Sequence, residues 1–266
     1  MMQEIPEPKW VASFKRVFAL NGSGKGTQVA IVAESQSRPV MAQLAGLALF
    51  DLGAVYSTIT LPTAPQSAPV PVKSTGASHA VQGIRHVIEA LKHVEVIVDV
   101  TVEGLIHAEE MAEIEQAGTR LLVICNEHPE VLERTEPYAD LGPKVALGIQ
   151  MLSDASEMRV TSRAGTDLTI NIKDAPCGGT PGFSTRPGAV DHWPGGLCLC
   201  FPGKNAVNGR IVMDVGDMNL TFKSYLSNQI TMIIENDYIT DIQGDNLDAE
   251  LFREYLKAWD LSLIHI

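Results

Sequence analysis

Hydrophobic positions in the first 152 residues change repeatedly between helical spacing and continuous strand-like runs. Apolar side chains recur at helical spacing, with capping or helix-ending residues beside several of them, in residues 10–18, 37–53, 78–91, 107–117 and 137–155. Short apolar runs typical of buried strands occupy residues 28–33, 55–61, 94–100 and 120–125. This alternation predicts an α/β domain at residues 1–152, in which helices cover a parallel sheet.

The pattern changes from residue 153 onward, where short strand-like segments are separated by turns. These segments are residues 158–161, 167–172, 197–201, 210–214, 229–234 and 238–242, followed by one helical segment at 248–259. They predict a second, β-rich α+β domain at residues 153–260. The Pro/Ala/Ser-rich stretch at 62–76 is long for a loop and is a candidate lid or interface arm.

Charge and composition exclude several classes of function. Acidic residues outnumber basic ones 32 to 20 in a chain of 266, giving a net charge of -12 that disfavours nucleic acids and anionic membranes. No apolar run reaches the ~18 residues of a membrane span, and the acidic, Pro-rich start is not a signal peptide. The four cysteines lack zinc-site spacing and are interpreted as core thiols of a cytoplasmic protein.

The segment GSGKGTQ, residues 22–28, resembles a phosphate-binding loop but stands in the opposite context. A P-loop connects a strand to a helix, whereas this segment follows a predicted helix and precedes a predicted strand. Ala19 occupies the position of the first glycine of that pattern, and Gly26 follows Lys25 where Ser or Thr is required. We therefore expect a turn and no nucleotide cofactor.

Histidines are the main candidates for chemistry among the residues of the first domain. His107 follows a predicted strand, and ligands of open parallel sheets bind beyond the carboxyl ends of strands. The alternative is that His107 only begins a helix and faces solvent. His79, His86 and His93 are spaced seven apart and predict a solvated or interface stripe on one helix. No complete set of metal ligands is evident, because none of the H-x-E pairs lies clearly within a strand.

The most individual stretch is DHWPGG, residues 191–196, which combines an acid, a histidine and a tryptophan in a Pro/Gly-rich frame. Loops of this composition often form the wall of a binding site. A plain turn with a packed Trp193 is the equally open alternative.

Four ordered blocks of sequence carry a resemblance that extends over most of the chain. They are Arg163–Leu168, Arg186–Gly195, Met213–Tyr225 and Asp248–Leu256. Together they resemble the 2,5-dihydroxypyridine 5,6-dioxygenase family, which degrades nicotinate, up to about residue 260. The resemblance implies an α/β domain joined to a second domain related to aminopeptidase T metallopeptidases, and it implies that this second domain is incomplete within this chain.

That resemblance also implies a chemistry. One Fe(II), held by two histidines and an aspartate, binds O2 and the dihydroxypyridine, and the ring opens to N-formylmaleamate. His107 matches the family's catalytic base and His192 is the substrate-binding candidate, whereas the iron ligands are expected beyond residue 266. The sequence departs from the family at Thr180, near which an acidic substrate contact is expected.

Two further expectations concern the chain end and the alternatives. Residues 261–266, LSLIHI, match the translation of a transposon-end adapter used in sequencing libraries, so a non-native tail is predicted and His265 is not taken as a ligand. The truncated chain is expected to be inactive, and the intact enzyme to form a homo-oligomer. The alternatives are an aminopeptidase T-like metallopeptidase, disfavoured by Leu197 where a metal-binding Glu is expected, and a non-catalytic binding protein of the same fold.

Overall fold

The computed structural model describes residues 4–65, 78–125, 127–219, 222 and 224–258. Among these, the chain divides into two compact units. The first unit holds residues 4–65, 78–146 and 179–197, and the second holds residues 147–178 and 198–258. No helix in the described part of the chain has the length and hydrophobicity to span a membrane.

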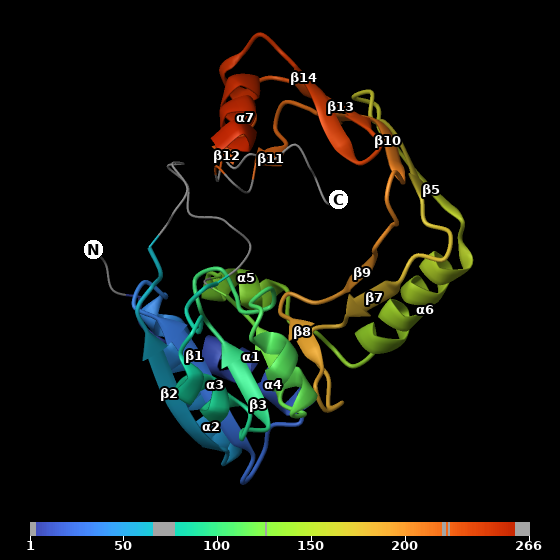
Figure 1. Ribbon diagram of the computed structural model, residues 1–266. Coiled ribbons are helices and arrows are strands. Elements are labelled where there is room, and N and C mark those ends of the chain that lie inside the picture. The colour runs from blue at the N-terminus through green and yellow to red at the C-terminus, as the bar shows by residue number, and fades with distance from the viewer. Residues whose placement is uncertain (1–3, 66–77, 126, 220–221, 223, 259–266) are drawn as a thin grey trace. The chain divides into compact units, whose positions relative to one another are not determined.

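The first unit is built on a five-stranded parallel sheet with the strand order β2-β1-β3-β4-β8 (Figure 1). Its strands are β1 (Gln28–Glu34), β2 (Val55–Leu61), β3 (Val96–Asp99), β4 (Arg120–Val123) and β8 (Val190–His192). Four of them follow the predicted apolar runs, and the predicted α/β class with a helix-covered parallel sheet is confirmed. The strand order reverses between β1 and β3, which makes the gap between these strands the topological switch point.

Helices cover both faces of this sheet because its strands are apolar on both sides. On one face, α1 (Pro8–Leu20), α2 (Pro39–Leu52) and α5 (Pro129–Arg134) pack against Val29 and Ile31. On the other face, α3 (Arg85–Leu91) and α4 (Met111–Gln116) pack against Ala30 and Val32. The alternation of these neighbours along β1 follows from the two-residue period of a strand.

The GSGKGTQ segment is a helix-to-strand turn, as predicted. Helix α1 ends at Leu20 and β1 begins at Gln28. Between them, Gly22 and Gly26 have φ values of +73° and +84°, a backbone conformation that glycine adopts without steric cost.

Three predicted helices begin later than the sequence pattern indicates. The segments expected at 78–91, 107–117 and 137–155 are α3, α4 and α6 (Leu141–Asp154). Residues 78–84 form turns, because the amide of Ser78 donates to the carbonyl oxygen of Gly104 and its hydroxyl to Glu34 instead of capping a helix. The prediction that His79, His86 and His93 share one helix is therefore wrong, since only His86 lies in α3.

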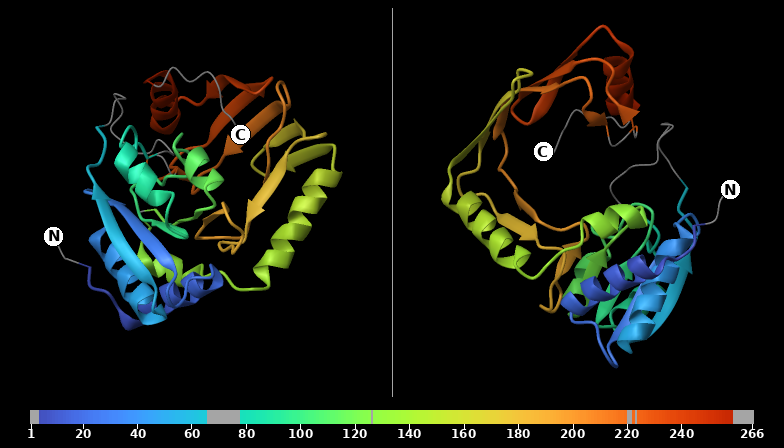
Figure 2. Two further views of the ribbon diagram at one scale, coloured as in Figure 1. Left: turned by 60° about the horizontal axis from the view of Figure 1, so that its bottom comes forward. Right: turned by 180° about the vertical axis from the view of Figure 1, so that it is seen from behind.

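The second unit contains an antiparallel five-stranded sheet with the order β14-β13-β10-β6-β5 (Figure 2). Its strands are β5 (Glu157–Thr161), β6 (Asp167–Asn171), β10 (Val207–Met213), β13 (Ile230–Glu235) and β14 (Tyr238–Gln243). Helix α7 (Leu247–Ala258) buries Ala249 against Ile230, Met232 and Ile242. Two smaller two-stranded sheets pair β7 (Cys177–Thr180) with β9 (Leu197–Cys200), and β11 (Met218–Asn219) with β12 (Ser224–Tyr225).

The division into units differs from the predicted boundary at residues 152 and 153. Residues 179–197 belong to the first unit, because β8 adds the fifth strand to its sheet. The amide of Trp193 donates to the carbonyl oxygen of Val123 at 2.9 Å, and its fully buried ring lies 4.9 Å from the ring of Phe14. Most of the predicted loop at 62–76 and the predicted tail at 261–266 lie outside the described residues.

Candidate functional site

The carboxyl edge of the parallel sheet gathers the buried acids of the first unit. Glu34, Asp99 and Asp191 are 5%, 0% and 4% exposed, respectively. Glu34 is the last residue of β1, Asp99 is the last residue of β3, and Asp191 is next to the last residue of β8. Because all five strands run in the same direction, these positions share one edge of the sheet. Burying a carboxylate is costly unless donors surround it, so the partners of these acids indicate what each acid holds in place.

His107 lies at this edge, in the segment between β3 and α4. It occupies an exposed turn that the Ala108 amide closes by donating to the carbonyl oxygen of Leu105 at 2.9 Å. The predicted helix start at His107 is wrong, because α4 begins only at Met111. The predicted position beyond the carboxyl end of a strand is confirmed.

His192 is the last residue of β8 and is partly buried. Its Nδ1 lies 2.9 Å from the carbonyl oxygen of Pro194. A carbonyl oxygen only accepts, so Nδ1 carries the proton and the neutral imidazole keeps its lone pair on Nε2. In this tautomer Nε2 of His192 can accept a hydrogen bond from a substrate hydroxyl.

The acid beside His192 is held by the threonine that stands where the family resemblance implies an acidic residue. The Thr180 hydroxyl donates to Oδ1 of Asp191 at 2.7 Å, and its oxygen accepts from the amides of Gly182 and His192. Burial raises the pKa of the Asp191 carboxyl above its ordinary value, against the lowering effect of the Thr180 hydrogen bond. Trp193 packs in the core and donates from Nε1 to the Thr135 carbonyl oxygen at 3.2 Å, so the packed-tryptophan interpretation holds for this residue.

Two further groups at this edge have perturbed ionisation: Asp99, which is buried, and Cys125, which is partly buried and follows β4. Burial raises the pKa of Asp99, although hydrogen bonds from Thr101 and Leu105 act in the opposite direction. Burial also raises the pKa of the Cys125 thiol, and the charge of Asp99 adds to this effect. Cys125 is consequently a protonated thiol at neutral pH rather than a nucleophile.

His128 has the opposite tautomer from His192. Its Nδ1 accepts from the amide of Glu130 at 3.2 Å, which leaves the proton of the neutral ring on Nε2, 3.4 Å from the Glu4 carboxylate. The side chain therefore caps α5 and holds the N-terminal segment.

The two candidate histidines share an edge of the sheet but are not brought into contact. Strand β4 lies between β3, which precedes His107, and β8, which ends at His192, and no hydrogen bond or ring contact joins the two histidines among the described residues. Within the same residues, no group of three or more His, Cys, Asp or Glu side chains is arranged to hold a metal ion. The described part of the chain therefore does not fit an iron site by itself.

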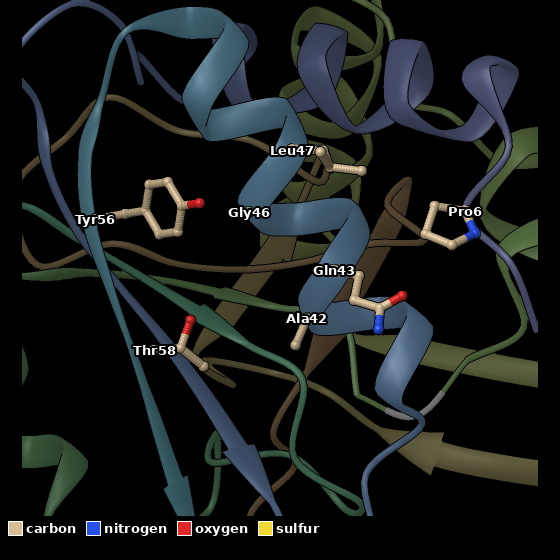
Figure 3. A pocket seen from close by; sticks show the side chains of 7 residues that line it. All are labelled: Pro6, Ala42, Gln43, Gly46, Leu47, Tyr56 and Thr58. Carbon is tan, nitrogen blue, oxygen red and sulfur yellow. The ribbon is translucent and has the colours of Figure 1, made fainter.

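A cavity of about 350 Å³ lies elsewhere on the first unit, between α2 and β2 (Figure 3). It is lined by Pro6, Ala42, Gln43, Gly46, Leu47, Tyr56 and Thr58. The lining has no ionisable group other than the Tyr56 hydroxyl, and neither candidate histidine contributes to it.

Sequence reasoning missed the three buried acids and the role of Thr180. A signal for two of them was present, because Glu34 and Asp99 each end a run of apolar residues, where a charge is unexpected within a buried strand. Asp191 stood out only as part of the DHWPGG stretch, and neither Asp191 nor Thr180 gave a comparable signal of burial. Their pairing depends on β8 joining a sheet whose neighbouring strand is far away in the sequence.

The family model described as NicX, 2,5-dihydroxypyridine 5,6-dioxygenase, matches residues 9–262. A 2,5-dihydroxypyridine 5,6-dioxygenase of Pseudomonas putida KT2440 is 36% identical over 171 residues, which cover 64% of this chain and 48% of that protein. The match thus spans about half the length of the curated relative.

Two solved structures share the architecture. The 2,5-dihydroxypyridine dioxygenase from Pseudomonas putida KT2440 is similar with a TM-score of 0.87 at 29% identity, over 98% of this chain and 75% of that one. AmpT from Thermus thermophilus has a TM-score of 0.57 at 12% identity, over 94% of this chain and 74% of that one. The second similarity shows a common fold alone.

Proposed function

The chain belongs to the 2,5-dihydroxypyridine 5,6-dioxygenase family, and we propose from this membership that the intact protein cleaves the ring of 2,5-dihydroxypyridine with O2. The observation that carries the proposal is the family match over residues 9–262, which includes both candidate histidines. The similarity to AmpT concerns the fold, so no specific observation favours a peptidase.

The proposed reaction breaks the bond between ring carbons 5 and 6 and places both atoms of O2 in the product. The ring loses four electrons and O2 gains four, so no external reductant is required. The product with this balance is N-formylmaleamate, and the proposed role is a step of nicotinate degradation in the cytoplasm by a homo-oligomeric enzyme.

The proposal includes Fe(II) as the cofactor that lets O2 react with the ring. Because the described residues hold no metal-binding group, we assign none of them as an iron ligand and place the ligands elsewhere in the intact protein. For the same reason, the 266-residue chain is expected to be inactive by itself.

His107 is proposed as the base that takes a hydroxyl proton from the substrate. An imidazole suits this role because its ordinary pKa lies near neutral pH. Its exposed turn beyond β3 leaves the ring accessible to a ligand at the carboxyl edge. His192 is proposed to bind the substrate, with Nε2 accepting a hydrogen bond from a hydroxyl group.

The test is O2 uptake by the protein expressed from its intact gene, with 2,5-dihydroxypyridine and Fe(II) supplied and the product identified by mass spectrometry. His107→Ala should lower turnover by ~10²-fold at neutral pH, with partial recovery at high pH, where the substrate ionises unaided. His86→Ala is the matched control, because His86 is also an exposed histidine of the first unit but lies within α3.

Two results would contradict these assignments. Absence of O2 uptake by the intact protein refutes the proposed reaction. Turnover of His107→Ala at the rate of His86→Ala refutes the role of His107 as the base, while leaving the reaction itself in place.

A further inference from the structure

The switch point of the parallel sheet is filled by the segment of the chain that leads to His107. Ligands of open α/β sheets commonly bind in the crevice beyond the strands where the order reverses, here β1 and β3. In this protein, Val100, Thr101 and Leu105 are fully buried there, although they belong to a connecting segment. The buried residues of the loop that carries His107 therefore occupy this crevice.

Asp99 binds this loop through both carboxylate oxygens. Oδ1 accepts from the amide and the hydroxyl of Thr101 at 2.9 and 2.6 Å, and Oδ2 accepts from the amide of Leu105 at 2.6 Å. Leu105 begins the turn that holds His107, so the last contact of Asp99 lies two residues before the imidazole. Hydrogen bonds to a buried carboxylate are among the stronger ones in proteins.

Glu34 supplies the second attachment, from the neighbouring strand β1. Its Oε2 accepts from the amide of Val102 at 2.9 Å, and its Oε1 accepts from the hydroxyl of Ser78 at 2.8 Å. The amide of Ser78 in turn donates to the carbonyl oxygen of Gly104 at 2.8 Å. Two buried acids on the two strands that flank the switch point thus hold successive amides of the same loop.

We propose that Asp99 and Glu34 are positioning residues for His107: they fix the backbone of residues 101–105 so that the turn presents the imidazole at the carboxyl edge of the sheet. Burying two carboxylates is costly unless hydrogen-bond donors surround them. Here that cost is offset by hydrogen bonds from the backbone amides of one connecting loop rather than by a cation. For kinetics the inference rests on the proposed role of His107, whereas its structural part does not depend on that role.

The test compares Asp99→Asn with Thr119→Val in the protein expressed from its intact gene. Asparagine keeps the shape of Asp99 but turns an NH2 group toward a loop amide. Thr119 is the matched control, because its buried hydroxyl donates to the carbonyl oxygens of Leu91 and Val94, just before the amino end of β4 at the opposite edge. Hydrogen exchange at the amides of residues 101–107 should accelerate about 10-fold or more in Asp99→Asn and stay unchanged in Thr119→Val.

Measurements of turnover then test whether the position of the loop affects the reaction. Asp99→Asn should lower kcat, and the double variant Asp99→Asn/His107→Ala should be no slower than His107→Ala, because the acid acts through the histidine. If Asp99→Asn does not fold, Glu34→Gln provides the same comparison through Val102.

Each outcome decides one part. Unchanged exchange at residues 101–107 overturns the proposal, and so does a double variant whose loss is the product of the two single losses. If the wild-type protein takes up no O2, the proposed reaction fails, and the exchange measurement alone decides whether the acids hold the loop.

Discussion

Gly104 provides a quantitative test of the packing beneath the His107 loop. Its φ is +85°, and a Cβ built on it would lie 2.8 Å from Sγ of Cys125 and 3.2 Å from Cγ1 of Val123. An L-residue in the left-handed conformation costs about 1–2 kcal/mol, and an added methyl group in a packed site costs about 1–3 kcal/mol. Gly104→Ala should therefore lower the free energy of unfolding by about 2–5 kcal/mol.

Gly26→Ala separates these two contributions. Gly26 has nearly the same φ, +84°, but an added Cβ there would meet no atom within 4 Å. Its replacement should cost only the conformational part, about 1–2 kcal/mol or less, because alanine also restricts the unfolded chain. The difference between the two variants measures the contact with Cys125 and Val123.

The assay is urea unfolding followed by tryptophan fluorescence. Trp10 and Trp193 both belong to the first unit, and Trp259→Phe in all variants restricts the signal to that unit. Cys125→Ala should be less harmful in the presence of Gly104→Ala than alone, since it removes the nearest clashing atom. Equal losses in Gly104→Ala and Gly26→Ala, with no coupling to Cys125→Ala, would show that the description of this loop is wrong.

Two further predictions concern other parts of the first unit. Isothermal titration with ATP and Mg²⁺ should give no heat of binding, because GSGKGTQ connects a helix to a strand; a micromolar dissociation constant would contradict this. Asp191→Asn should flatten the pH dependence of stability. Because burial raises the pKa of folded Asp191, the folded state binds more protons than the unfolded state, so this group makes stability fall as the pH rises from the ordinary pKa of about 3.9 through the raised value. Below the ordinary pKa the two proteins should show a constant difference in the free energy of unfolding. A loss of stability of the wild type relative to Asp191→Asn as the pH falls through that range would refute the assignment.

The sheet of the first unit could be read from the sequence because its central strands are short, continuous apolar runs. Strand β2 was located to the residue, and β1, β3 and β4 to within two residues at either end. Helix starts were less accessible, because at residues 78–84 and 107–110 the hydrophobic spacing continues although the backbone forms turns, next to segments that side chains of the sheet hold in place. Periodicity reports which faces are buried and carries no information about such long-range partners.

The site shows the same limit more strongly. His107 could be placed from its position after a strand, whereas the polarity of β8 gave no sign that it joins the parallel sheet. Its three residues, Val190 to His192, are too few for a periodic signal and include two polar side chains. The orientation of His192 depends on this pairing and on the Pro194 carbonyl oxygen, and neither is visible in the sequence alone.

The late arrival of β8 has a consequence for how the protein is made on the ribosome. The chain completes β1 to β4, continues into β5 and β6 of the other unit, and only then supplies β8 and Trp193 to the first core. Until residue 193 has been synthesised, β4 is an open edge, and Phe14 has Phe18 but not yet Trp193 as an aromatic neighbour. Nascent chains therefore expose a hydrophobic strand edge while the intervening segment is synthesised. During this interval the chain is prone to aggregate, and a chaperone that binds the edge would protect it.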